Sequence, residues 1–353
     1  MKLREQVGQL IVAGVEGLEL SAMERAWLKL VRPGGVILFR RNIEQATQVA
    51  ELLREVTQVA GAPLFRCVDV EGGLVDRLRD VIAPMPSAAA VFATGERANF
   101  VRHGRLIARE AKALGFNTVF APVLDLALPA SAAVMKSRVV SANPADVIAY
   151  GSAFVDGLDA EGILGCGKHF PGLGGGTLDS HKATPRIGRT WKQLWAEDLV
   201  PFRALVPRLP LMMVSHAAYP QTRDVTPASV SRFWISTVLR KRIGYQGLVI
   251  SDDMEMGGIL TQMPIEDAAV KAVLAGTDLI EICRDPSLVL RAYEALLVEA
   301  EGSAAFRRRV DESCERVVEA KNRLLDAAMP RPVSAAQFDK LREAVKKFAG
   351  EVQ

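Results

Sequence analysis

The chain alternates between short, continuous apolar runs and longer segments whose apolar residues recur at helical spacing. Continuous rather than alternating apolar runs are typical of parallel strands that are buried on both faces of a sheet. The runs predict eight strands, at residues 7–15, 34–39, 63–70, 117–126, 163–170, 211–219, 248–254 and 277–283.

The segments between the strands have the pattern of amphipathic helices. In 42–60, Asn42 is the expected N-cap, and Gly61 follows the last apolar residue as the expected C-terminal stop. Further helices are expected at 142–162, 190–206, 230–243, 265–275 and 286–300, and in the C-terminal region 303–349.

Eight strand–helix repeats predict an α/β fold, the (β/α)8 TIM barrel. Surplus residues fall after residue 70, after the fifth strand and in the C-terminal helices. Since no linker rich in Gly, Ser or Pro divides the chain, we expect one domain over 1–353, with a core of about 5–328 and a helical extension of about 329–353. A doubly wound open sheet is the alternative, but VAGVEGLEL (12–20) does not fit its glycine-rich loop.

Composition and charge indicate which classes of binding partner are not expected. The net charge is +3 and the basic residues are scattered, which gives no reason to expect nucleic acid. No stretch is apolar for long enough to span a bilayer, and the N-terminus lacks the features of a signal peptide, so we expect a cytoplasmic protein. No CxxC pair is present, and buried free thiols are expected rather than zinc ligands at Cys67, Cys166, Cys283 and Cys314.

The predicted strands end in polar residues. In a barrel enzyme the reacting groups lie at the C-terminal ends of the strands, and burying charge there is costly unless it serves a purpose. These ends therefore predict a site for a polar, hydroxyl-rich or charged ligand. The residues are Asp69, Glu71, Arg77, Asp125, Lys168, His169, Ser215, His216, Ser251, Asp252, Asp253 and Glu281.

Several of these residues also have a purely structural explanation. Asp125 could cap the following loop, His216 could be a hydrogen-bonded core residue, and Glu281 is expected to be an ion-pair partner inside the barrel. Strand alternation points the side chains of Asp252 and Asp253 in opposite directions, so at most one of them is expected to face the barrel axis.

The stretch KHFPGLGGGTLDSHKATPRI (168–187) concentrates unusual chemistry in one loop. It holds two of the four histidines of the chain, His169 and His181, together with Asp179. Its glycines tolerate backbone angles that other residues resist, which suits a loop that moves.

Six sequence blocks, given at the end of this paragraph, lie along nearly the whole chain. Their order and spacing resemble those of the β-N-acetylglucosaminidases of glycoside hydrolase family 3, of the single-domain NagZ type. KHFPG followed by DSH is the most specific of them. The resemblance implies a retaining exo-enzyme that removes terminal β-linked GlcNAc through a covalent glycosyl-enzyme. It also implies a role in peptidoglycan recycling, on GlcNAc-1,6-anhydro-MurNAc and its peptides. The blocks are 32–43, 68–78, 115–126, 168–181, 212–220 and 248–256.

The same resemblance implies a role for each matched residue. Asp252 would be the nucleophile, and His181 the general acid/base with Asp179 as its partner. A histidine suits this task because its ordinary pKa lies near neutrality. The family needs no metal or cofactor, the partner would be a small carbohydrate, and a monomer or weak dimer is expected. The sugar-binding positions would be Asp69, Arg77, Arg138, Lys168 and His169.

The loop departs from the family pattern. Leu173, Gly175 and Gly176 stand where the family usually has His, Asp and Thr, and Leu74 stands where Arg usually follows EGG. These departures leave loop closure and the preferred aglycone open.

Three other functions also stay open. One is a β-N-acetylglucosaminide phosphorylase of the same family, since a histidine acid would not repel phosphate. Another is a sugar-binding protein that has lost catalysis. The third is a metal-dependent hydrolase built on Asp179, His181, His169 and Asp252, which no HxH or HExxH motif supports.

Overall fold

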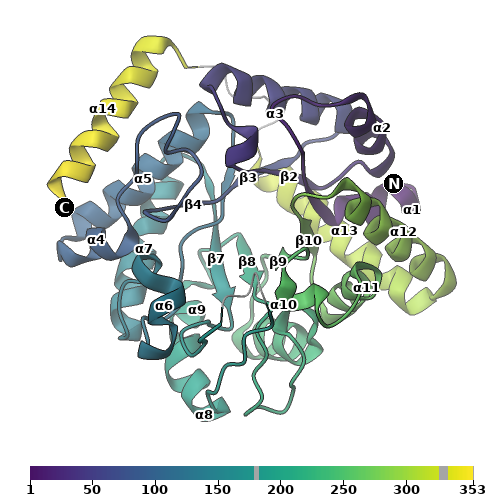
Figure 1. Cartoon of the computed structure of the whole chain (residues 1–353). Helices are drawn as coiled ribbons and strands as arrows, with labels where there is room; N and C mark the ends of the chain where they lie inside the picture. Colours follow the sequence, from purple (N-terminus) through teal and green to yellow (C-terminus); the bar gives the residue numbers. More distant parts are fainter. Residues whose placement is uncertain (179–182, 326–332, 353) are drawn as a thin grey trace.

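The computed structural model describes residues 1–178, 183–325 and 333–352. Eight parallel strands close into a barrel in the order β1-β10-β9-β8-β7-β6-β3-β2, with helices around it (Figure 1). The predicted (β/α)8 barrel is therefore confirmed. The strands are β1 (Ile11–Gly14), β2 (Gly35–Leu38), β3 (Phe65–Val68), β6 (Thr118–Val119), β7 (Leu164–Phe170), β8 (Leu211–Val214), β9 (Leu248–Asp253) and β10 (Leu279–Ile282).

Helices follow the strands and cover the outside of the barrel. The principal ones are α2 (Ala22–Val31), α3 (Ala46–Ala60), α5 (Arg97–Ala113), α7 (Pro144–Asp159), α9 (Leu199–Leu205), the π-helix η6 (Phe233–Ile243), α11 (Ile265–Ala275) and α12 (Pro286–Gly302). Shorter or additional ones are α1 (Leu3–Gln9), α4 (Ala88–Ala93), α6 (Ala132–Met135), α8 (Trp191–Gln193), the π-turn η4 (Leu194–Asp198), α10 (Gly257–Leu260), α13 (Ala304–Leu324) and α14 (Ala335–Glu351). None of the helices within the described ranges is both long and apolar enough to cross a membrane.

Apolar side chains from the strands fill the inside of the barrel. This packed layer includes three of the four cysteines, and all four cysteines are buried and free, as the sequence predicted. The interior is thus a core rather than a channel, and a ligand site is expected above this layer, at the C-terminal ends of the strands. The layer contains Val12, Ile37, Phe65, Cys67, Phe120, Cys166, Leu211, Met213, Leu248, Ile250, Leu279 and Cys283.

Two predicted element starts were wrong. The first strand begins at Ile11 because residues 7–9 complete α1. Helix α3 begins at Ala46, so Asn42 is not its N-cap. The Asn42 side chain instead donates from Nδ2 to the carbonyls of Val15 and Gly17, at 3.0 and 2.8 Å, and ties the loop after β1 to the loop after β2.

The surplus residues after β3 and at the C-terminus lie on one side of the barrel. A hairpin, β4 (Val70–Gly72) and β5 (Val75–Asp76), follows β3 directly. Helix α14 packs against α5 on the outside (Figure 1). Phe348 of α14 is fully buried, and Arg342 donates to the carbonyls of Val81 and Ile82 beyond the hairpin.

An aromatic cluster packs beside the start of the loop after β7. Trp191, Trp195, Phe233 and Trp234 contact one another, and the ring of Tyr219 lies 4.8 Å from that of Trp234. The Tyr219 hydroxyl donates to the carbonyl of Gly172 at 2.9 Å. This aromatic cluster therefore anchors the first residues of the loop.

Candidate active site

Two consecutive side chains at the end of β7, Lys168 and His169, line the same cavity. Neighbours in a regular strand point to opposite faces of the sheet. Between Gly167 and Phe170, however, β7 advances one residue more than the paired stretch of β8. This bulge accounts for both polar side chains lining the cavity at the C-terminal opening of the barrel.

Lys168 is buried between two carboxylates that follow β3. Its Nζ lies 2.8 Å from Asp69 Oδ1 and 2.7 Å from Glu71 Oε1, and its side chain is only 3% exposed. Burial alone would lower the pKa of Lys168, but the two carboxylates outweigh it and raise that pKa. The ammonium group therefore stays charged at the buried end of the cavity.

Glu71 also forms a two-pronged ion pair with Arg138. Arg138 Nε lies 2.7 Å from Glu71 Oε2, and Nη2 lies 2.8 Å from Oε1. Burial would raise the pKa of Glu71, yet Arg138 and then Lys168 lower it well below its usual range. Glu71 thus holds the two cations together.

His169 is oriented by Asp125 on one side and Arg138 on the other. Its Nδ1 lies 2.7 Å from Asp125 Oδ2, and its Nε2 lies 3.2 Å from Arg138 Nη2. Since a guanidinium only donates, Nε2 accepts and Nδ1 carries the proton, so the ring is neutral in this arrangement. Asp125 Oδ1 also accepts from the Leu173 N–H at 2.7 Å. Asp125 therefore both caps the loop and orients His169.

Both Asp252 and Asp253 line the cavity, so the expectation that at most one would face it was wrong. The reason is a second bulge: β9 advances one residue more between Ile250 and Asp253 than β10 does between its partner residues. The Asp253 N–H donates to Asp252 Oδ1 at 3.0 Å. Burial, together with the charges of Glu255 and Asp252, raises the pKa of Asp253 to about 7.

Glu281 lines the same cavity but is not the expected ion-pair partner. Among the described residues no cation contacts it; its Oε1 accepts from the Cys283 thiol at 2.9 Å. Burial, followed by the charges of Asp253 and Asp69, raises the pKa of Glu281 well above its usual range. The position of an acid in a strand does not reveal which charges the fold brings close to that acid.

His216 agrees with the core interpretation. It is fully buried, with Nδ1 2.7 Å from Ser229 Oγ and Nε2 2.9 Å from the carbonyl of Asp253. Because a carbonyl only accepts, Nε2 carries a proton. His216 thus supports the β9 bulge from behind.

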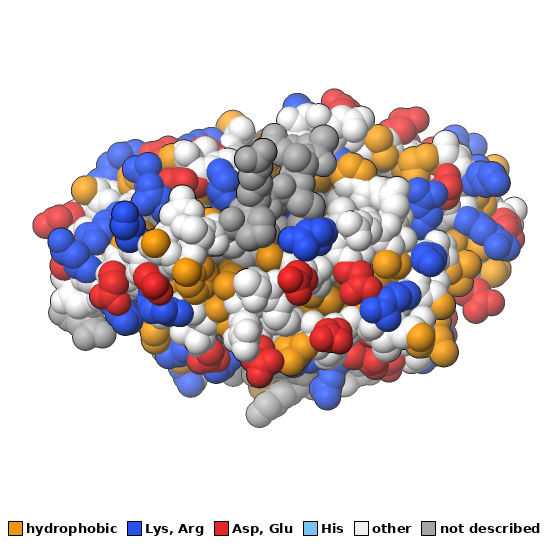
Figure 2. Space-filling model, turned by 90° about the horizontal axis from the view of Figure 1, so that it is seen from above, with side chains coloured by type: hydrophobic (Ala, Val, Ile, Leu, Met, Phe, Trp, Pro, Cys, Tyr) orange, Lys and Arg blue, Asp and Glu red, His pale blue; other side chains and the backbone are white. Residues whose placement is uncertain are grey.

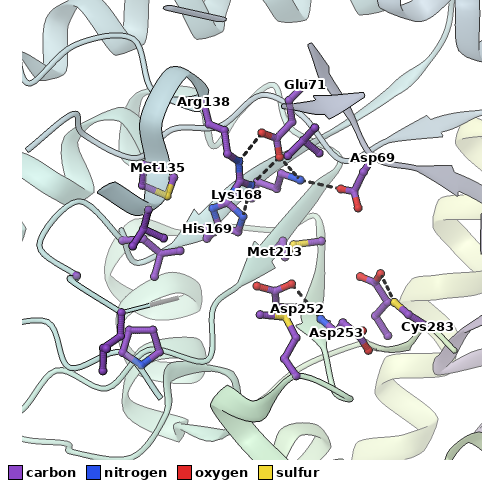
Figure 3. Close-up of a pocket in the computed structure, with 18 of the residues that line it drawn as sticks. Asp69, Glu71, Met135, Arg138, Lys168, His169, Met213, Asp252, Asp253 and Cys283 are labelled. Atoms are coloured by element: carbon purple, nitrogen blue, oxygen red, sulfur yellow. Dashed lines mark hydrogen bonds and ion pairs between the residues drawn. The ribbon is translucent and has the colours of Figure 1, made fainter. Parts of the chain in front are cut away.

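The cavity encloses about 850 Å³ including the open space at its mouth, within the range of about 300–1,000 Å³ for small-ligand sites. Figure 3 shows Asp69, Glu71, Arg138 and Lys168 on one side, and Asp252, Asp253 and Cys283 on the other, with Met213 between them. The described residues among those predicted for the site all line this cavity: Asp69, Arg77, Arg138, Lys168, His169 and Asp252.

The predicted acid/base pair, Asp179 and His181, lies outside the described residues. Leu178, just before these undescribed residues, and Pro185, shortly after them, both line the cavity. Of the positions that depart from the family pattern, Leu173 and Gly176 line it as well, whereas Leu74 is 57% exposed.

Comparison with known proteins assigns the family. The model for the glycosyl hydrolase family 3 N-terminal domain matches residues 2–320. The chain belongs to this family. It is 36% identical over 305 residues to a "Beta-hexosaminidase" of Idiomarina loihiensis, an alignment that spans 85% of this chain and 91% of the relative. The chain is thus a glycoside hydrolase of the β-hexosaminidase type, as predicted.

Solved structures of family 3 proteins agree with the fold. A family 3 β-N-acetylglucosaminidase from Paenibacillus sp. superposes with a TM-score of 0.91 at 32% identity, over 99% of this chain and 69% of that one. Native NagZ from Neisseria gonorrhoeae gives a TM-score of 0.79 at 28% identity, over 98% and 97% of the two chains.

The prediction for this family 3 site omitted several cavity residues. Glu71, Asp253 and Glu281 were among the polar strand ends that predicted a ligand site but received no catalytic or sugar-binding role, and Phe39 and Cys283 were not singled out for the site. Only their position in the cavity lining, which depends on the closure of the barrel, identifies them.

Proposed function

We propose that this family 3 enzyme is a retaining exo-β-N-acetylglucosaminidase. The observation that carries the proposal is the division of the cavity into two chemically distinct walls. One wall holds Lys168 and Arg138 on carboxylates, and the other holds Asp252, with no cation among the described residues paired with it. The first wall suits sugar hydroxyls and the second suits attack on the anomeric carbon.

The first wall offers donors and acceptors in fixed places. Asp69 presents a carboxylate oxygen beside Lys168, and Arg77 lies 3.8 Å from the other oxygen of Asp69. Burial would raise the pKa of Asp69, but Lys168 and then Arg77 lower it, which keeps it an acceptor. Together with Arg138 and His169, these groups would bind the hydroxyls and the acetamide of GlcNAc.

In the proposed reaction, Asp252 attacks the anomeric carbon while the bond to the aglycone oxygen breaks and His181 gives its proton to that oxygen. Water then attacks the same carbon, His181 takes the proton from the water, and the bond to Asp252 breaks. Asp179 would hold the His181 ring and favour its charged form. The roles of Asp179 and His181 rest on the family resemblance.

The proposed natural substrate is GlcNAc-1,6-anhydro-MurNAc with or without its peptide, degraded in the cytoplasm during peptidoglycan recycling. This part rests on the resemblance to NagZ-type enzymes. No cofactor enters the proposed mechanism, so EDTA should leave turnover unchanged.

The first test is hydrolysis of 4-nitrophenyl β-GlcNAc and of the matching β-glucoside in phosphate-free buffer. Release from the GlcNAc compound alone supports the proposal. Release that requires added phosphate would favour a phosphorylase, and binding of GlcNAc without turnover would favour a sugar-binding protein.

Replacing Asp252 by Asn should lower kcat by at least about a thousandfold, because the amide cannot form the glycosyl-enzyme. A fluorinated GlcNAc-type inhibitor should label the wild-type protein, and peptide mapping should find the sugar on Asp252. Asp253→Asn is the matched control; a label on Asp253 would mean that the neighbouring carboxylate is the nucleophile.

His181→Ala should impair substrates according to their leaving groups. A disaccharide needs protonation of its leaving oxygen, so its kcat/KM should fall by about a hundredfold or more. A dinitrophenyl glycoside needs little help and should lose less than about tenfold. Equal losses on both substrates would contradict the acid role.

A further inference from the structure

Glu281 is held against the part of β9 that carries Asp252. Its N–H donates to Ser251 Oγ at 3.0 Å, and its carbonyl accepts from the Met254 N–H at 2.8 Å. Glu281 also pairs in register with Asp253 across the bulge. These contacts fix the Glu281 backbone beside the proposed nucleophile.

The Glu281 side chain lines the cavity and is 3% exposed, and only one of its two carboxylate oxygens is hydrogen-bonded in the described structure. Oε1 accepts from the Cys283 thiol, whereas Oε2 is buried and has no hydrogen-bond partner in the described part of the chain. Lys168 and Arg138, two cations of the cavity, are already engaged by Asp69 and Glu71.

The charges that act most strongly on Glu281 come from acids, and thiols lie nearby. These groups are Asp252 and Asp253 from β9, Asp69 after β3, and the thiols of Cys283, Cys67 and Cys166. Burial and these carboxylates together keep the proton on Glu281, in line with the direction of its pKa shift. A neutral carboxyl group has one O–H donor, and nothing described within the protein accepts from it.

We propose that Glu281 is a specificity-determining residue that donates a hydrogen bond to an acceptor oxygen of the bound sugar, on the wall that carries Asp252. The acceptor is a ring hydroxyl or the acetamide carbonyl. The proposal rests on the proposed function, since it takes an amino sugar as the ligand. It assigns Glu281 to substrate recognition, in addition to the positions implied by the family resemblance.

The test compares Glu281→Gln, which keeps a donor, with Glu281→Leu, which removes it. Gln should keep kcat/KM for nitrophenyl β-GlcNAc within about threefold, whereas Leu should lose about tenfold or more. The same enzymes are then assayed on 3-, 4- and 6-deoxy analogues and on the β-glucoside. On the one analogue that lacks the oxygen contacted by Glu281, the wild-type enzyme and Glu281→Leu should have the same kcat/KM.

Glu110 provides a matched control. It too is fully buried with neither carboxylate oxygen hydrogen-bonded in the described structure, but it lies outside the cavity lining. Glu110→Leu should change the thermal midpoint without changing the ranking of the analogues. An equal loss by Glu281→Leu on every analogue, or a Gln variant as impaired as Leu, would overturn the proposal.

Failure of the proposed function would look different. It would appear in the wild-type protein, as no hydrolysis of the GlcNAc compound, before any variant is made. In that case GlcNAc binding is measured by calorimetry: weaker binding by Glu281→Leu but not Glu281→Gln still supports the contact, and equal binding overturns it.

Discussion

At the scale of single residues, two buried carboxylates each contact two groups of the site. Glu71 contacts both Arg138 and Lys168, and Asp125 contacts both His169 and the loop. Each carboxylate thus fixes two groups, so the loss of one acid should disturb more than one contact with the sugar.

Glu71→Gln should leave two buried cations short of a partner. Breaking a buried pair costs about 3–5 kcal/mol, and we expect kcat/KM to fall by about a hundredfold as Arg138 and Lys168 lose their positions. Urea unfolding and steady-state kinetics measure the two effects. Glu266→Gln is the control, since Glu266 makes the same two-pronged pair with Arg291 on the surface, where solvent screens the charges and the cost should be much smaller. Similar losses for the two variants would contradict this view.

From the sequence alone, polar residues that directly follow apolar strands pointed to positions that line the cavity. Lys168, His169 and Asp252 follow apolar strands, and that contrast alone pointed to them. The expectation that Glu281 forms an ion pair was wrong, because an acid can be buried inside a barrel either by pairing with a cation or by keeping its proton. The choice depends on which charges the fold brings near, and here they are all acidic.

At the scale of elements, the rule that successive side chains of a strand point to opposite faces failed in β7 and β9, the two strands that carry Lys168 and Asp252. The bulges in β7 and β9 each add a residue, so two adjacent side chains line the cavity where alternation allows one. Bulges are common beside active sites, but they depend on pairing with the neighbouring strand. The positions of the eight strands were predictable, whereas their register was not.

Helix α14 should contribute to global stability although it lies far along the chain from its partner α5. Phe348 is buried, and Arg102 of α5 stacks on its ring at 4.7 Å. Phe348→Ala should therefore lower the free energy of unfolding by about 3–5 kcal/mol. Lys340→Ala, exposed on the same helix, is the control. An unchanged unfolding midpoint for Phe348→Ala would mean that α14 is dispensable.

At the scale of the whole molecule, the surface charge is mixed in sign. Acidic and basic side chains are interspersed over the face in Figure 2, in keeping with a net charge of +3. The charges that matter lie in the cavity and, at the opposite end of the barrel, at Lys321.

Lys321 is buried at the N-terminal end of the barrel, where its Nζ donates to Gln9 Oε1 at 2.6 Å and lies over the ring of Phe65. Burial lowers its pKa to about 7, from 10.5. Between these values the unfolded chain binds more protons than the folded one, so stability should rise with pH through this window.

Lys321→Met should stabilise the protein at pH 7 by a few kcal/mol, and the gain should shrink towards pH 10. Thermal unfolding across this range measures the effect. Lys241→Met, at an exposed position, should show no such trend. A gain that did not vary with pH would instead reflect packing alone.

The aromatic cluster beside the loop has a spectroscopic consequence. Three of the four tryptophans of the chain, Trp191, Trp195 and Trp234, belong to it, and Tyr219 connects it to Gly172 in the loop. The intrinsic fluorescence of the unlabelled protein therefore originates largely beside the loop. Sugar binding that shifts the loop should change this emission, which gives a direct optical titration of the site.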